Sequence, residues 1–154
     1  MVKRFYVQTP RNAIHFGKNL KASGSTIEPG MVVTLESSGS QVTLCGSAEA
    51  PLGLAFGERH GVYHPTTRIF ADGEALVVAT SSFMALLTAE FFSSGSLPTT
   101  SPTTLYTAAS GLIGTSSSST TKIGQYLRTE TLNQPLGGTG SSQSLGLCRF
   151  NFQP

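Results

Sequence analysis

The sequence contains little of what catalytic and disulfide-stapled proteins need. Of its 154 residues none is tryptophan, two are cysteine, one is aspartate and 12% are charged, where a soluble globular chain has about 25%. Two cysteines exclude a small fold held together by several disulfides, and the shortage of carboxylates limits catalytic combinations. No apolar run reaches the roughly 18 residues of a membrane-spanning helix, and no signal peptide is visible. We therefore expect synthesis in the cytoplasm and no membrane partner.

Hydroxyl groups take the place of the missing charges. Serine and threonine together account for 39 of the 154 residues. A hydroxyl is easier to bury against a partner than an ammonium or a carboxylate, whose burial costs several kcal/mol unless the charge is paired. The composition therefore favours a surface that contacts other protein. It is also typical of β-rich domains, because threonine suits strands and serine suits turns, and the composition alone leaves both interpretations open.

Short apolar segments separated by glycine turns recur along the chain. The length predicts one domain, because 154 residues bury an independent core but do not divide into two ordinary domains. Residues 30–35 and 41–45 flank a polar turn and predict a hairpin. Further strands are expected at 51–56, 68–71, 74–80, 105–111, 122–127 and 145–152, and the glycines in the segments 51–56 and 105–127 are expected to admit a neighbouring backbone closely. The sequence thus predicts a mainly β fold, a small barrel or sandwich, over residues 24–154.

Alternation in the last expected strand separates two kinds of side chain. Phe150 and Phe152 fall on one face, and Arg149 and Asn151 fall on the other, because successive side chains of a strand point to opposite sides. This predicts a strand with one buried face and one polar face.

Residues 83–92 are apolar in a pattern that fits two structures. A serine at position 81 or 82 would cap a helix, and alanine, leucine, methionine and glutamate favour one. A buried strand fits the same residues. We expect one short helix here, which plugs the barrel or covers an open edge. The following segment, residues 93–104, contains Pro98 and Pro102 and no charge, and we expect it to be an exposed contact loop.

The first 23 residues concentrate positive charge. Five of the ten lysines and arginines precede the first acidic residue, Glu28. The segment also carries aromatic and aliphatic residues, interrupted by Pro10 and Gly17, which makes it too irregular for a helix and too apolar for a solvated tail. We therefore expect an extended basic arm, residues 1–23, that docks on a partner. Nucleic acid is not the expected partner, since the basic residues form no concentrated patch.

The two cysteines lie in strand-like apolar segments. Cys45 and Cys148 are expected to be buried free thiols, because proteins made in the cytoplasm rarely hold disulfides. A bridge between them remains open, since the sequence does not give the Cα separation that a disulfide requires.

The remaining reactive residues do not combine into a catalytic or metal site. His60 and His64 are four residues apart, but Gly61 and Pro65 disfavour the helix that would bring them together, and no third ligand is near in sequence. No serine stands in a Gly-x-Ser-x-Gly motif. A glycosidase pair of Glu58 and Glu74 would depend on a spatial separation that the sequence does not give. We expect no enzyme activity, no metal and no cofactor.

Several short pieces occur in an order that resembles a known family. The pieces are Pro29-Gly30, Leu52-Gly53-Leu54-Ala55, Asp72-Gly73-Glu74, Leu105-Tyr106 and Ile123-Gly124. Their order resembles that of the small capsid decoration, or cement, proteins of tailed bacteriophages, over about residues 24–150. The resemblance implies a virion protein without enzyme activity that binds the outer surface of the expanded head. There it clamps neighbouring major capsid protein subunits and usually forms a symmetric homo-oligomer. The first expectation for the oligomer is a trimer and the second is a dimer.

This resemblance turns two segments into expected capsid contacts. In the basic arm the expected contact residues are Lys3, Arg4, Phe5, Tyr6 and Arg11. In the proline-containing loop they are Leu97, Pro98 and Pro102, which would meet the capsid or another decoration subunit. The alternative is a head or tail fibre module that binds host surface glycans, against which the absence of tryptophan counts.

Overall fold

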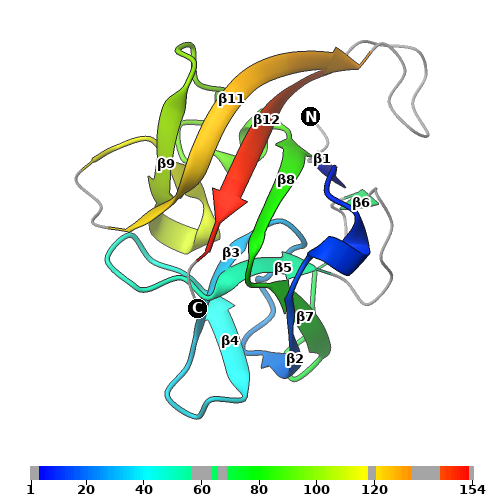
Figure 1. The fold of residues 1–154 in the computed structure, drawn as a ribbon. Helices are drawn as coiled ribbons and strands as arrows, with labels where there is room; N and C mark the ends of the chain where they lie inside the picture. Colours follow the sequence, from blue (N-terminus) through cyan, green and yellow to red (C-terminus); the bar gives the residue numbers. More distant parts are fainter. Residues whose placement is uncertain (1–3, 57–63, 66–68, 118–120, 133–142, 153–154) are drawn as a thin grey trace.

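The chain folds into two β-sheets connected by turns and single turns of 3₁₀ helix. The computed structural model describes residues 4–56, 64–65, 69–117, 121–132 and 143–152. Figure 1 shows the larger sheet in the upper half of the molecule and the smaller sheet below it. The prediction of a mainly β fold that contains a small barrel is confirmed.

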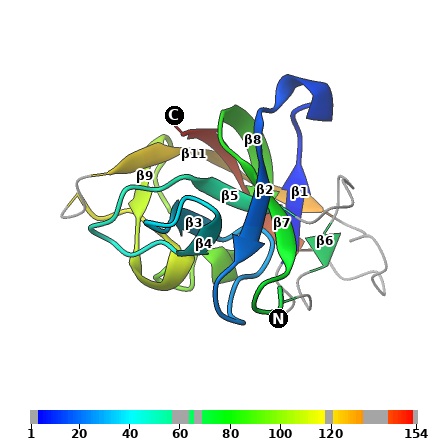
Figure 2. The ribbon, with the colours of Figure 1, turned by 90° about the horizontal axis from the view of Figure 1, so that it is seen from below.

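The smaller sheet is a closed barrel. Its strands are β2 (Phe16–Ala22), β3 (Val32–Leu35), β4 (Gln41–Leu44), β5 (Gly53–Phe56) and β7 (Ala75–Ala79), hydrogen-bonded in the order β2-β4-β3-β5-β7. The predicted hairpin is confirmed, because β3 and β4 pair antiparallel with Val33 opposite Leu44. The barrel closes through β2, which pairs in parallel with β4 and antiparallel with β7 (Figure 2).

The larger sheet is antiparallel and has the order β10-β9-β11-β12-β8-β1-β6. Its strands are β1 (Arg4–Val7), β6 (His64–Pro65), β8 (Ser82–Leu87), β9 (Thr103–Thr107), β10 (Ile113–Gly114), β11 (Lys122–Leu132) and β12 (Gln143–Asn151). The predicted alternation at the end of the chain is confirmed. Phe150 and Phe152 are buried, whereas Arg149 and Asn151 are exposed.

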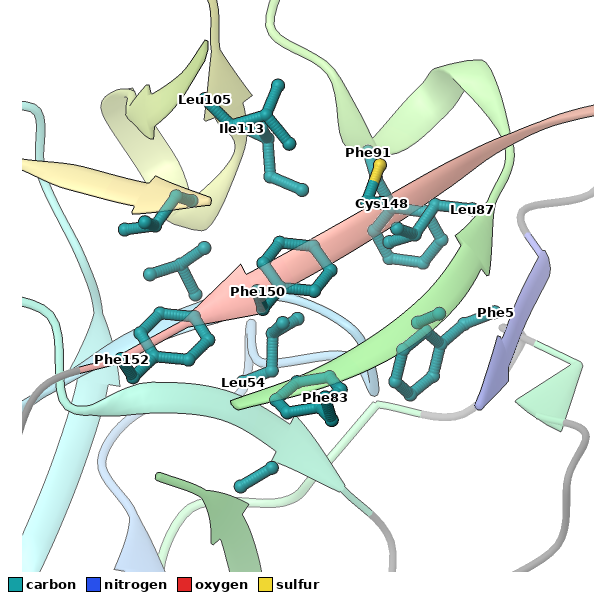
Figure 3. Packing of buried hydrophobic residues seen from close by; sticks show 14 of the residues in the cluster. Phe5, Leu54, Phe83, Leu87, Phe91, Leu105, Ile113, Cys148, Phe150 and Phe152 are labelled. Carbon is teal, nitrogen blue, oxygen red and sulfur yellow. The ribbon is translucent and has the colours of Figure 1, made fainter. Parts of the chain in front are cut away.

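The main core lies where the barrel meets the inner face of the larger sheet. Phe83 of β8, Phe150 of β12 and Leu54 of β5 gather there (Figure 3), and all three belong to one cluster of buried residues. The ring centroids of Phe83 and Phe150 are 5.3 Å apart, and those of Phe56 and Phe83 are 5.8 Å apart with nearly perpendicular planes. Aromatic pairs at such separations stabilise beyond the area they bury. The two sheets therefore share one core, and a second cluster fills the barrel interior.

The predicted extended arm is wrong for the described part of residues 1–23. Phe5 and Val7 of β1 pair with Leu87 and Ala85 of β8, and Phe5 is fully buried. β2 is a strand of the barrel. The basic residues misled the prediction, because in β2 the exposed Lys21 alternates with buried neighbours and its charge does not oppose burial of the strand. The N-terminal segment thus belongs to both sheets.

The predicted short helix in residues 83–92 is also wrong. The segment forms strand β8 followed by a single 3₁₀ turn, η2 (Ala89–Phe91). β8 lies between β1 and β12, and apolar residues face both sides of it: Phe83 toward the main core and Leu86 toward Tyr6 on the outer face. A strand covered on both faces shows a continuous apolar run, which hides the two-residue period by which strands are recognised.

The other 3₁₀ turns are η1 (Arg11–Ala13) and η3 (Ala109–Gly111). The described residues therefore contain only three-residue helical turns, none of which is long enough to cross a membrane.

Candidate functional site

A polar groove crosses the outer face of the larger sheet. It has a volume of about 620 Å³ and runs over β8, β12, β11 and β9. We call it the sheet groove, and it is lined by Ser82, Thr104, Lys122, Gly124, Gln125, Arg149, Phe150 and Asn151. Strand pairing brings these residues together, because Arg149 lies opposite Gln125, Gln125 opposite Thr104, and Asn151 opposite Ser82. Directly opposed residues of an antiparallel pair share one face of the sheet.

Hydrogen bonds within the sheet groove already engage both of its amide oxygens. The Arg149 guanidinium donates to Gln125 Oε1 at 2.6 Å, and the Ser82 hydroxyl donates to Asn151 Oδ1 at 2.8 Å. The NH₂ groups of Gln125 and Asn151 then remain as donors. Because a guanidinium carries five N–H donors in a fixed fork, Arg149 keeps further donors as well.

The sheet groove carries positive charge without a matching carboxylate. Lys122 and Arg149 line it, both are exposed, and no acidic residue is among the lining residues. Within the described part of the chain, neither of them has a carboxylate at salt-bridge distance. By contrast Arg128, farther along β11, is paired with Glu130 at 2.8 Å. The groove can therefore stabilise a bound anion.

A second surface lies on the proline-containing loop. Residues 93–102, here called the hydroxyl loop, connect η2 to β9 and border a shallow hollow of about 320 Å³. The hollow is lined by Ser94, Ser96, Leu97, Pro98, Thr99, Thr100, Thr103 and Thr115. None of these residues is charged, and six of the eight carry hydroxyl groups. Such a surface loses little solvation energy when a protein covers it.

The hydroxyl loop is anchored to the body of the protein. Its first residue, Ser93, donates its backbone N–H to the Ile113 carbonyl at 2.8 Å, and Gly95 donates to Phe92 at 2.9 Å. Leu97 packs against the main core cluster. The Ser94 hydroxyl donates to the Ser96 carbonyl at 3.0 Å. These contacts tie the start of the loop and Leu97 to the body of the protein. A loop that is restrained before binding loses less entropy when a partner binds.

The structure divides the predicted contact residues into two groups. Leu97 and Pro98 line the hollow of the hydroxyl loop, and Pro102 is exposed beside it. In the N-terminal segment that was expected to be an arm, Phe5 is fully buried and Tyr6 is 4% exposed. Neither side chain is available to a capsid, so the prediction that they are capsid contacts is wrong. Phe5 packs against Phe56 with ring centroids 5.2 Å apart. The backbones of Arg4 and Arg11 lie in β1 and η1, and Lys3 lies outside the described residues.

No local pattern in the sequence predicts the sheet groove. The alternation in β12 placed Arg149 and Asn151 on a polar face, but nothing local indicated that Gln125 and Lys122 lie beside them. Their proximity depends on the pairing register of β11 with β12 and β9, which includes an irregularity between Lys122 and Gly124. A search for polar residues on the solvent faces of all strands would have given the candidates but not their neighbours.

Other candidate residues stay apart or lie outside the described residues. His60 and Glu58 are among the latter. Glu74 accepts a hydrogen bond from the Ala71 backbone N–H at 2.8 Å, within the turn that contains Asp72 and Gly73. Among the residues that the structure describes, no three His, Cys, Asp or Glu side chains gather as metal ligands.

Both thiols are free and buried, as predicted. Burial raises the pKa of Cys45 from 9.0 to about 11, with a further contribution from the Glu49 carboxylate, and burial raises the pKa of Cys148 to about 12. Thiolates are the reactive form of cysteine, so neither residue is suited to nucleophilic chemistry near neutral pH.

The thiols give the protein a stability that depends on alkaline pH. The unfolded chain loses its thiol protons near pH 9.0, whereas the folded chain keeps them until about pH 11 and 12. The contribution of each buried thiol to the free energy of unfolding is therefore complete below pH 9. It is lost as the pH rises from 9 to about 11 for Cys45 and to about 12 for Cys148. Between pH 8 and pH 10 we expect the free energy of unfolding in urea to fall by about 1 kcal/mol per thiol. In Cys148→Ala the decrease in the free energy of unfolding between pH 8 and pH 10 should be smaller by the contribution of one thiol. An unchanged pH dependence in that variant would contradict the role of the Cys148 thiol.

Comparisons of the chain with protein-family models, with curated proteins and with solved structures give no match.

Proposed function

We propose that the protein is a bacteriophage capsid decoration protein, which binds the outer surface of the expanded head and clamps neighbouring major capsid protein subunits. The observation that carries the proposal is the hydroxyl loop, an exposed, anchored surface whose hollow is lined without a single charge. The order of short motifs from Pro29 to Gly124 and the low overall charge support the same function. No step of bond making or breaking is involved.

The clamp acts by mass action. A protein that binds the expanded lattice and not its alternatives stabilises that lattice by RT ln(1 + [L]/Kd) at each site. Many identical sites on one shell add their contributions, and linked sites raise the effective concentration of each other. Moderate affinity at each site is then sufficient to oppose pressure from packaged DNA.

A symmetric homo-oligomer fits this role. A decoration protein at a threefold position of the lattice would be a trimer, and one at a twofold position would be a dimer. An oligomer makes the same contacts with every surrounding capsid subunit only if its rotational symmetry matches that of the site. Of these two oligomers, we propose the trimer. Light scattering coupled to size exclusion gives the mass of the free protein, which is 16.1 kDa per chain. A free monomer would restrict oligomer formation to the capsid surface.

The contact surface can be tested by placing a charge in the hydroxyl loop. In Thr99→Glu an exposed residue that lines the hollow becomes a carboxylate. If the loop is covered by the capsid, the charge must be buried without a partner, and we expect binding to weaken by about 10-fold or more. Co-sedimentation with expanded, undecorated capsids of the phage that encodes the chain measures the change.

The matched control for that variant is Ser37→Glu. Ser37 is exposed in the turn between β3 and β4, and the same charge there leaves the hydroxyl loop intact. We expect wild type and Ser37→Glu to bind saturably and alike. Equal weakening by both variants would assign the effect to net charge, and absence of binding by the wild-type protein would refute the decoration function.

A further inference from the structure

The sheet groove offers many hydrogen-bond donors and two cations to whatever enters it. We propose that it binds a carboxylate-bearing saccharide, such as a chain of uronic acids. This site is separate from the capsid contact proposed for the hydroxyl loop, because the two sets of lining residues have no member in common.

The donor set determines the charge of the ligand. The amide oxygens of Gln125 and Asn151 each accept one hydrogen bond, from Arg149 and Ser82, and the NH₂ groups of both amides are available to donate. Arg149 and Lys122 add charged donors that lack a carboxylate partner among the described residues. Charge-assisted hydrogen bonds to a carboxylate are about twice as strong as neutral ones, and a guanidinium can hold both carboxylate oxygens. An anionic, acceptor-rich ligand therefore fits the groove.

The position of the groove argues against an extended peptide. It lies over β8, β12, β11 and β9, which are adjacent in the sheet, and β12 and β11 are paired on both sides. A peptide that adds to a sheet needs an open edge with unpaired backbone groups. The groove also lacks an exposed apolar pocket for an anchoring side chain, because its single aromatic residue, Phe150, is fully buried.

The same features argue against nucleic acid. Single-stranded nucleic acids are bound by stacking of bases on exposed aromatic side chains together with several phosphate contacts. The lining of the groove provides no exposed aromatic ring and two cations. The absence of tryptophan counts against a glycan held by stacking, but a carboxylate-bearing saccharide can be held through its polar groups. Its hydroxyl groups would pair with side-chain amides and hydroxyls such as Asn151 and Thr104, and its carboxylate would pair with Arg149 and Lys122.

Titration with a trimer of galacturonic acid, followed by amide chemical shifts of the full chain, tests the proposal. We expect saturable shifts centred on β11 and β12. Arg149→Gln and, as a second variant at an exposed site, Lys122→Gln should each weaken binding by about tenfold. The matched control is Arg128→Gln, which removes an exposed cation on β11 that is paired with Glu130 outside the groove. We expect this control to bind like the wild-type protein.

Four results would overturn the proposal. The first is that the wild-type protein does not bind the trimer. The second is that the methyl-esterified trimer binds as tightly as the free acid, which would show that the carboxylate is not recognised. The third is equal weakening by Arg128→Gln, which would indicate unspecific attraction. The fourth is tighter binding of a hexaglutamate peptide, which would assign the groove to an acidic protein segment. We expect Arg149→Gln to co-sediment with capsids like the wild-type protein, because Arg149 lies outside the hydroxyl loop. Failure of saccharide binding can therefore be distinguished from failure of the decoration function.

Discussion

Removal of residues 1–23 is expected to leave the chain unfolded. The deletion takes away β2, which closes the barrel between β4 and β7, and leaves the edges of both strands unpaired. It also takes away β1 and the fully buried Phe5, whose ring lies against Phe56 and Phe91. Loss of a buried phenylalanine alone costs about 3–5 kcal/mol, which is comparable to the whole stability of many domains. Circular dichroism and thermal unfolding of the truncated protein would measure the effect.

A charge variant provides the control for the truncation. Lys18→Ala combined with Lys21→Ala removes two exposed charges of the same segment and keeps its backbone in β2. Since surface substitutions usually change stability by less than about 0.5 kcal/mol, we expect this variant to unfold like the wild-type protein. If the truncated protein instead kept a cooperative unfolding transition near that of wild type, the N-terminal strands would not be part of the core. Capsid binding is therefore better tested with surface variants than with the truncation.

Gly53→Ala is expected to destabilise the protein by about 3 kcal/mol or more. A Cβ at this position of β5 would lie 2.0 Å from the Ala79 carbonyl oxygen and 2.9 Å from Val78 Cγ1. The first contact is with the backbone of the adjacent strand β7, so relief requires the two strands to move apart and to lose ladder hydrogen bonds. Gly124 has the same relation to the Arg149 carbonyl, at 2.1 Å. Urea unfolding followed by tyrosine fluorescence would give the change in free energy.

Gly39→Ala separates this steric effect from the general effect of replacing a glycine. Gly39 lies in the turn between β3 and β4 with φ of +75°, and a Cβ there would meet nothing within 4 Å. The cost is then limited to the left-handed backbone, about 1 kcal/mol. Equal losses of stability for Gly53→Ala and Gly39→Ala would show that the close approach of β5 and β7 is not the cause.

Local chemistry predicted several elements correctly. The polar turn between residues 35 and 41 gave the β3–β4 hairpin, because the turn and its flanking apolar runs are contiguous in sequence. The two-residue alternation around Phe150 gave the buried and exposed faces of β12, because that strand has a core on one side there. The buried glycine at 53 was recognised as a point of close backbone approach, which the contact with Ala79 bears out.

The errors have a common physical origin. The prediction of a helix at β8 is wrong because apolar neighbours cover both faces of this strand, which removes the alternation that marks a strand. The prediction of an N-terminal arm is wrong because the basic residues of this segment do not form a solvated block: Lys21 alternates with the buried Leu20 and Ala22. In both cases the burial of a residue is set by strands that are distant in sequence.

The sequence by itself determined the β class, the β3–β4 hairpin and the uncharged hydroxyl loop, since each follows from residues that are near neighbours in the chain. The strand expected at 68–71 is wrong for residues 69–71, and the strand expected at 105–111 ends at Thr107, before the turn η3. Tertiary structure alone decided that β1 and β2 belong to different sheets, and that Lys122, Gln125 and Arg149 meet in one groove. The physical reason is strand register. A shift of one residue turns every side chain to the opposite face, and register is fixed by packing of the whole core.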